Sequence, residues 1–115
     1  MEYVRVNNDV RISCLGIGKI VNKVKETVYA EMGIGLSVAY STDKIVKHNK
    51  NIKELLEVGD IVEYTVGNMK NVYISTIKKY GKGVGIDHYS LEQINIKKIL
   101  TKQQYELNCF RLEET

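Results

Sequence analysis

A chain of 115 residues, 43% of them hydrophobic and 27% charged, can bury one compact core but is too short for several large domains. Seventeen Lys and Arg against 14 Asp and Glu leave a net charge of +3, milder than nucleic-acid-binding domains usually carry. No apolar run approaches the roughly 20 residues of a membrane span, and the N-terminus lacks signal-peptide character, so we expect a cytoplasmic protein without membrane contact.

The residue types favour β structure. Eight Tyr stand against one Phe and no Trp, and Ile and Val are abundant, which suits half-buried strands. Because the chain has no Pro, its turns must be made by the nine Gly and by Asn and Asp. We therefore expect a mainly β protein with short connections.

Apolar alternation predicts a meander in the first part of the chain. The predicted strands are 3–6, 10–14, 20–24, 27–32, 36–40 and 44–47. Lys25-Glu26 makes a tight hairpin, and the basic alternation of Lys44–Lys47 is typical of an edge strand.

A short helix of about two turns is predicted after this meander. Asn51 is a good N-cap, Glu54 completes a capping-box-like pair, and Gly59 is placed to end the helix. Strands at 60–66, 72–77 and 83–88 follow, with Lys78–Lys82 as an exposed hairpin tip.

The last part predicts a helical turn at 91–94, a strand at 95–100 and a second short helix. Thr101 and Gln104 form a capping box for that helix, which runs through Leu107. The chain then ends with a strand at 109–112.

The two halves resemble each other in pattern. With Tyr40-Ser41 placed over Tyr89-Ser90, Asn51 falls on Thr101 and Glu54 on Gln104 after a gap of one residue. The fold predicted is thus two small SH3-like, barrel-like meander units packed into one compact domain, 1–115, with subunits 1–58 and 59–115. Internal duplication and shared architecture without common descent both fit this pattern.

Three segments resemble small proteins encoded by phages and prophages of low-GC Gram-positive bacteria. They are Asp43–Asp60, with its Ile45-Val46-Lys47-His48 and Glu57-Val58-Gly59-Asp60; Ile99–Tyr105; and, weakly, Glu2–Arg5. The chain departs from the resemblance between Val66 and Gln93, where Gly81, Gly83, Gly85 and His88 have no counterpart.

The proteins of this group have no assigned enzymatic activity, so the resemblance assigns no catalytic residue. We expect a protein that is not an enzyme and has no cofactor. The resemblance implies a mobile-element setting in the host bacterial cytoplasm, where small proteins that bind and inhibit host machinery are common. We therefore expect a non-enzymatic accessory protein that docks on a host or phage protein, with anti-defence inhibition of the anti-CRISPR kind as one form. Partner identity and oligomeric state stay open.

Catalytic and metal chemistry have little support in the pattern. His48 and His88 lie far apart, and Cys14 and Cys109 match no metal-ligand spacing, so we expect reduced, inert thiols. Gly81-Lys82-Gly83 superficially resembles a phosphate loop but lacks the G-K-[ST] ending, so a flexible hairpin is favoured.

Lysines provide the candidate binding residues. The partner-binding prediction comprises Lys78, Lys79, Tyr80 and Lys82 on the late hairpin, with Lys44, Lys47, Lys50, Lys97 and Lys98 on two strand edges. The alternative function is a small basic β-barrel whose lysine rims hold phosphates while tyrosines stack bases. The same lysines also fit solvated edges that discourage aggregation.

Overall fold

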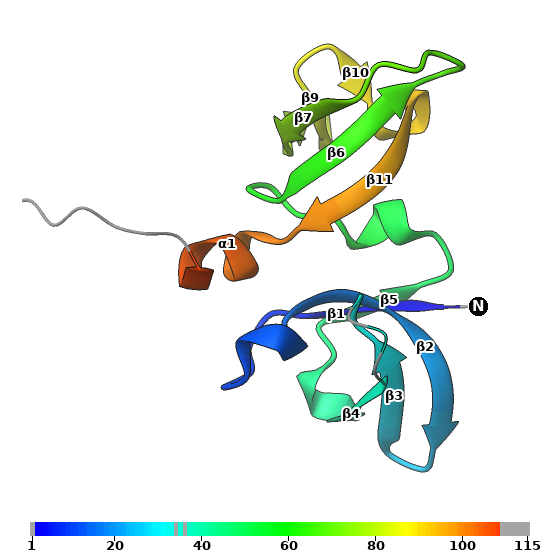
Figure 1. The fold of residues 1–115 in the computed structure, drawn as a ribbon, viewed down its shortest axis with the longest axis vertical. Coiled ribbons are helices and arrows are strands. Elements are labelled where there is room, and N and C mark those ends of the chain that lie inside the picture. The colour runs from blue at the N-terminus through cyan, green and yellow to red at the C-terminus, as the bar shows by residue number, and fades with distance from the viewer. Residues whose placement is uncertain (1, 34, 36, 109–115) are drawn as a thin grey trace, which may run out of the picture.

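The chain folds into two β lobes stacked along the long axis of the molecule (Figure 1). This computed structural model describes residues 2–33, 35 and 37–108. Three antiparallel sheets make up the two lobes, and one short α-helix lies beside their junction (Figure 1). The predicted mainly β class is therefore confirmed.

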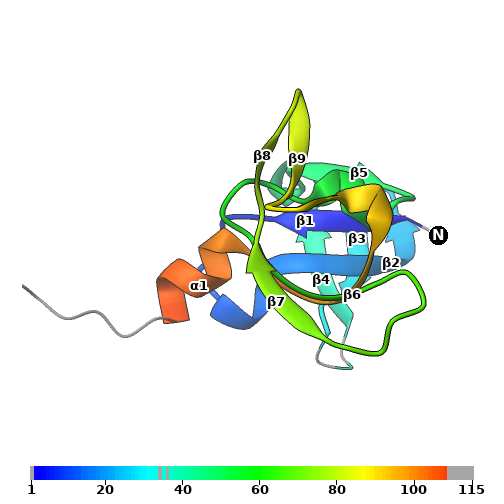
Figure 2. The same cartoon turned by 90° about the horizontal axis from the view of Figure 1, so that it is seen from above.

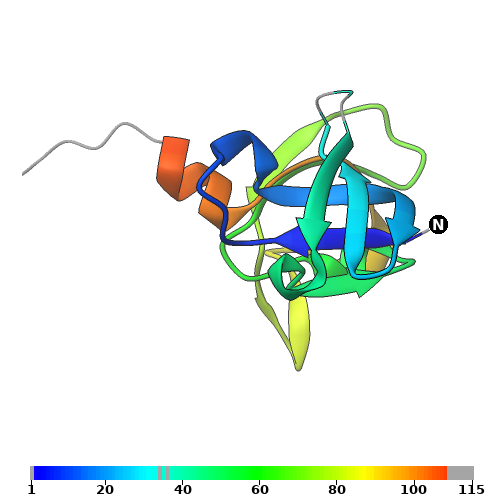
Figure 3. The same ribbon diagram turned by 90° about the horizontal axis from the view of Figure 1, so that it is seen from below.

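The first lobe is a single five-stranded sheet with the strand order β4-β3-β2-β1-β5 (Figure 3). Its strands are β1 (Tyr3–Val6), β2 (Gly16–Val24), β3 (Thr27–Glu31), β4 (Ser37–Ser41) and β5 (Lys47–Asn49). Two one-turn 3-10 helices, η1 (Ile12–Cys14) and η2 (Thr42–Lys44), interrupt it. The last strand returns to pair with the first, which closes the meander around its core.

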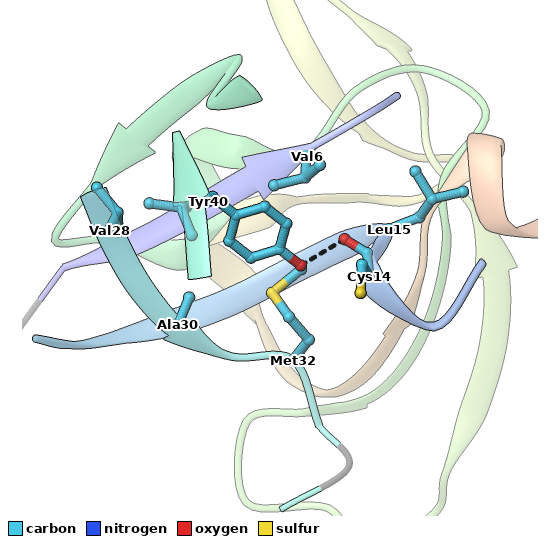
Figure 4. Close-up of a cluster of buried hydrophobic side chains, with 8 residues drawn as sticks. Val6, Cys14, Leu15, Val28, Ala30, Met32 and Tyr40 are labelled. Atoms are coloured by element: carbon cyan, nitrogen blue, oxygen red, sulfur yellow. Dashed lines mark hydrogen bonds between the residues drawn. The ribbon is translucent and has the colours of Figure 1, made fainter. Parts of the chain in front are cut away.

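That first core centres on Tyr40 (Figure 4). The Tyr40 hydroxyl donates a hydrogen bond of 2.6 Å to the carbonyl of Cys14, and burial raises the pKa of the phenol well above its usual range. Its neighbours are small or aliphatic: Val4, Val6, Cys14, Leu15, Val28, Ala30 and Met32. The prediction that Cys14 is a buried core thiol is confirmed; Cys109 lies outside the described residues.

The second lobe has two three-stranded sheets, ordered β11-β6-β7 and β10-β9-β8. Its elements are β6 (Ile61–Val66), β7 (Tyr73–Thr76), β8 (Lys78–Tyr80), β9 (Gly83–Ile86), β10 (Tyr89–Ser90), the 3-10 helix η4 (Leu91–Gln93) and β11 (Ile94–Leu100). A separate core fills this lobe, made of Leu56, Val62, Tyr64, Ile77, Ile86 and Ile94.

Both lobes run through the same order of elements. In each, a meander ends at Tyr-Ser (Tyr40-Ser41 or Tyr89-Ser90), a 3-10 turn follows, and the last strand pairs with the first. A capped helical turn comes next in both cases, η3 (Ile52–Leu55) or α1 (Lys102–Asn108). This is the predicted pair of barrel-like units; internal duplication, and a boundary at residue 58, stay hypotheses.

The strand predicted at 10–14 is wrong. Asp9 accepts a hydrogen bond of 2.9 Å from the backbone N–H of Arg11, and the Arg11 side chain returns to the same carboxylate. This local turn leads into η1 and leaves Val10 fully in solvent, with 98% of its surface exposed. A side chain that bonds its own backbone outcompetes the strand favoured by alternation.

The first predicted helix is shorter than expected. Asn51 caps it by accepting from the N–H of Lys53, as predicted. The turn ends at Leu55, however, so Gly59 does not end it; Gly59, with a φ of +100°, lies in a separate turn before β6. The element is nevertheless only a four-residue 3-10 turn. The strand predicted at 44–47 is also shifted, because η2 occupies Thr42–Lys44 and β5 begins at Lys47.

The second predicted helix, α1, is confirmed together with its cap. The Thr101 N–H donates to Oε1 of Gln104 at 2.8 Å, and the Thr101 hydroxyl accepts from the N–H of Gln104. The Gln104 amide also reaches the carbonyl of Leu15 in the first lobe. The strand predicted at 109–112 lies outside the described residues.

A buried ion pair joins the lobes. Arg5, from β1, donates through both terminal nitrogens to the carboxylate of Asp60, and both side chains are fully buried. Arg5 also donates to the carbonyl of Leu55 at 2.9 Å and to Oε1 of Gln103 at 3.0 Å. The guanidinium thus fixes both helical turns, η3 and α1, against the first strand.

Both carboxylate oxygens of Asp60 also accept hydrogen bonds from the backbone. Besides Arg5, its carboxylate accepts from the backbone N–H of Glu57 at 2.8 Å and from that of Lys102 at 2.9 Å. Among the described residues, no buried side-chain polar atom lacks a hydrogen-bond partner. The joint is therefore a complete network, which is the condition under which a buried charge pair is tolerated.

Asp60→Asn should destabilise the protein by about 3–5 kcal/mol, because it removes the fully buried counter-charge of Arg5 and leaves only the partly exposed Glu57, whose Oε2 lies 3.2 Å from Nε of Arg5. Urea unfolding followed by circular dichroism measures the change. Glu63→Gln is the matched control, since it breaks a surface pair with Lys98 and should cost less than about 1 kcal/mol. Equal effects of the two substitutions would contradict this account of the joint.

Candidate partner-binding site

The predicted hairpin is formed by β8 and β9 and projects from the body of the second lobe (Figure 2). Lys78, Lys79 and Tyr80 make up β8 and are all exposed, and Lys82 is exposed in the turn. The structure therefore brings these four predicted residues together on one protrusion.

The glycines of this hairpin have structural roles. Gly81 adopts a φ of +59°, which suits the tight turn. A Cβ on Gly85 would lie 3.0 Å from Cβ of Tyr80, so glycine there lets the tyrosine pack across the hairpin. These roles support the predicted hairpin over a phosphate loop.

Lys78 anchors the hairpin to its own base. Its Nζ lies 2.8 Å from Oδ1 of Asp87, just beyond β9. The hydrogen bond and charge of Lys78 lower the pKa of the Asp87 carboxyl below its ordinary value of 3.8. The charge of Lys78 is therefore paired within the hairpin. Tyr80 has 47% of its surface exposed to solvent and is available for contact with a partner.

The other predicted lysines are divided between the two lobes. Lys44 is in η2, Lys47 in β5 and Lys50 just after it, all in the first lobe. Lys97 and Lys98 are in β11, the edge of a second-lobe sheet. Lys47, Lys97 and Lys98 therefore lie in edge strands, whereas Lys44 and Lys50 lie outside the strands.

Acidic neighbours take part of this positive charge. Nζ of Lys47 lies 3.7 Å from Glu57, and Nζ of Lys98 lies 3.8 Å from Glu63. Together with Lys78, three of the nine predicted residues are therefore ion-paired. The remaining lysines, Lys44, Lys50, Lys79, Lys82 and Lys97, are exposed.

One hollow in the first lobe contains a histidine. It has a volume of about 540 Å³, its floor is formed by aliphatic side chains such as Val4, Ile20 and Val28, and His48 and Glu2 stand at its rim. Nδ1 of His48 is 2.7 Å from Glu2. Among the described residues no cysteine lines this hollow; Cys109 lies outside them.

His88 makes an edge-on contact with the ring of Tyr89, at 6.5 Å between centroids. Within residues 2–33, 35 and 37–108, no three His, Cys, Asp or Glu side chains gather as a metal site would require. The same part of the chain holds no helix long and apolar enough to cross a membrane.

An apolar edge strand in the second lobe is a feature that the sequence analysis missed. Within the described residues β7 pairs with β6 alone, and Ile74 at 70%, Val72 at 55% and Met69 at 57% are strongly exposed in it or just before it. The uncharged run 71–77 was visible in the sequence. That β7 lies at the edge of its sheet follows from the order of the strands, which cannot be predicted from the local sequence pattern.

Lys78→Ala should raise the pKa of Asp87 back towards 3.8, because the ionised carboxylate loses its donor and its counter-charge. The Lys78–Asp87 pair stabilises the folded protein fully above the unfolded-state pKa of Asp87. This stabilisation is lost as the pH falls through the lowered pKa that Asp87 has in the folded protein. Carboxyl NMR titration of Asp87 measures this, with Lys79→Ala as the neighbouring control. An unchanged Asp87 titration would show that the pair does not form.

Comparison of the chain with protein-family models, with curated protein sequences and with solved structures gives no match to any of them.

Proposed function

We propose that the protein is a small non-enzymatic binding protein that docks on another protein through its second lobe. The observation that carries this is the projecting β8–β9 hairpin with exposed Tyr80 at its end (Figure 2). Tyrosine is enriched at interface hot spots, and the projecting hairpin presents this tyrosine to solvent. The partner proposed is a host or phage protein, and anti-defence inhibition of the anti-CRISPR kind is the specific form.

The balance of charge supports a protein partner. Glu57, Asp87 and Glu63 already neutralise three of the candidate lysines. The hairpin also lies in the same lobe as the exposed apolar strand β7. Apolar and aromatic side chains combined with a few free cations fit a protein surface better than a phosphate backbone.

Capture from a Gram-positive host lysate tests the proposal. The tagged chain should enrich one protein by mass spectrometry, and a Lys79→Ala, Tyr80→Ala, Lys82→Ala variant should lose it, because these side chains form the tip of the hairpin. A Lys44→Ala, Lys50→Ala variant, altered only in the first lobe, should retain it.

The captured partner also permits a test of anti-defence action. Expression of the chain in a host with an active defence system should raise phage plating efficiency, and the hairpin variant should not. Enrichment that is equal for both variants, or recovery of nucleic acid alone, would contradict docking through the hairpin.

Nucleic-acid binding is the second candidate, favoured by one observation. Five of the predicted lysines, Lys44, Lys50, Lys79, Lys82 and Lys97, are exposed and form no ion pair within the described part of the chain. Such cations can contact phosphates.

If this second function is correct, arbitrary single-stranded DNA should bind at low salt. Five phosphate contacts would reduce the affinity about a hundredfold or less between 50 and 200 mM salt, since log K falls by about 0.7 per contact for each tenfold rise in salt. Fluorescence anisotropy measures the slope. No binding at low salt would exclude the nucleic-acid function.

A further inference from the structure

The strand edge at β7 combines two properties that the other described edge strands do not share. β5, β8 and β11 carry lysines, a common protection against unwanted pairing. The edge strands β4 (Ser-Val-Ala-Tyr-Ser) and β10 (Tyr-Ser) are uncharged like β7, but they expose no large apolar side chain, whereas β7 exposes Tyr73 and Ile74. β7 has the sequence Tyr-Ile-Ser-Thr, with no charge, no proline and no bulge against β6. It therefore lacks the usual devices that keep an edge from accepting another strand.

The hydrogen bonds next to β7 show which of its backbone groups are free. The N–H of Ile77 donates to the carbonyl of Asp60 at 2.7 Å, and the N–H of Gly59 donates to the carbonyl of Ile77. Because bonded positions alternate along an antiparallel pair, Ser75 and Tyr73 also face β6. The N–H and C=O groups of Ile74 and Thr76 then point away from the sheet.

The side chains at these positions are also open. Ile74 exposes 70% of its surface, and Thr76 is exposed beside it on the same face. On the opposite face Tyr73 packs on Tyr64, with ring centroids 5.8 Å apart, which holds β7 in place. An extended segment could therefore form hydrogen bonds with the backbone of Ile74 and Thr76 and pack against the exposed Ile74 side chain.

Charge indicates what kind of segment fits. Residues 63–87 contain four lysines, Lys70, Lys78, Lys79 and Lys82, against two acids, Glu63 and Asp87. Lys78 is paired with Asp87. Lys70, before β7, and Lys79 and Lys82, on the hairpin after it, form no ion pair within the described residues. A partner strand with acidic residues at its ends would complement these unpaired cations.

A second copy of the chain fits less well. Antiparallel pairing of two β7 strands about Ile74 would set Lys70 of one copy opposite Lys78 of the other, and like charges directly opposite are destabilising. The unpaired lysines beyond the two ends of β7, Lys70, Lys79 and Lys82, would also repel those of a second copy.

We propose that β7 binds an extended, apolar segment with acidic flanks from a partner protein, which adds a strand to the β11-β6-β7 sheet. This rests on the proposed function as a protein-binding module and names how the partner is held. The β8–β9 hairpin, which follows β7 directly, would contact the same partner (Figure 2).

The test uses the full chain and a fluorescein-labelled synthetic peptide that alternates valine with threonine and carries aspartates at both ends. Anisotropy should show saturable binding, and Ile74→Pro should weaken it about tenfold or more, because proline removes an N–H that faces the added strand. Hydrogen exchange should slow at the Ile74 and Thr76 amides when the peptide is bound.

Two further variants test whether an effect of Ile74→Pro is specific to the β7 edge and independent of proline. Ala39→Pro removes an N–H from the opposite edge of the molecule, on β4, and should leave peptide binding unchanged. Ile74→Lys places a cation beside Glu63, keeps the strand folded, and should also weaken binding. Circular dichroism and thermal unfolding confirm that each variant is folded.

The proposal is overturned if a folded Ile74→Pro variant binds the peptide as tightly as the wild type, or if no peptide binds. It is also overturned if analytical ultracentrifugation shows a dimer that Ile74→Pro dissociates, since β7 then pairs with a second copy. A partner captured from lysate that Ile74→Pro retains and the hairpin variant loses would leave docking intact while excluding strand addition.

Discussion

The structure depends on the buried ion pair between Arg5 and Asp60. Each lobe has its own apolar core, and neither core continues into the other as one cluster. Ile17, from β2, packs against the second core, and a polar network holds the lobes in a defined relation: the Arg5 guanidinium, from β1, reaches η3, the start of β6 and α1. Such a network adds little net stability, but its fixed geometry permits one arrangement of the lobes.

The position of α1 follows from the same network. Asp60 accepts the first N–H of the helix, at Lys102, and so complements the capping box of Thr101 and Gln104. A helix of seven residues would be marginal alone. Its order therefore comes from the joint, and in turn the Gln104 amide ties it back to Leu15 of the first lobe.

The second lobe differs from the first in how its sheet is divided. In the first lobe, β2 is one long strand that pairs with β1 and then with β3. In the second, the chain splits at the buried Ile77 into β7, which pairs with β6, and β8, which pairs with β9. This split frees one edge of β7 and directs the β8–β9 hairpin away from the core, so both candidate contact surfaces arise from one break in the strand.

The sequence by itself determined the features that depend on near neighbours: the β class, the alternation in β3 and β6, the caps at Asn51 and Thr101, and the hairpin at Lys78–Lys82. It failed where a side chain bonded its own backbone, at Asp9 and Arg11. Only the tertiary structure decided that Arg5 meets Asp60, 55 positions away, and that β7 is an unprotected edge. The physical reason is that capping and alternation act within a few residues, whereas charge pairing and strand order depend on how distant segments pack.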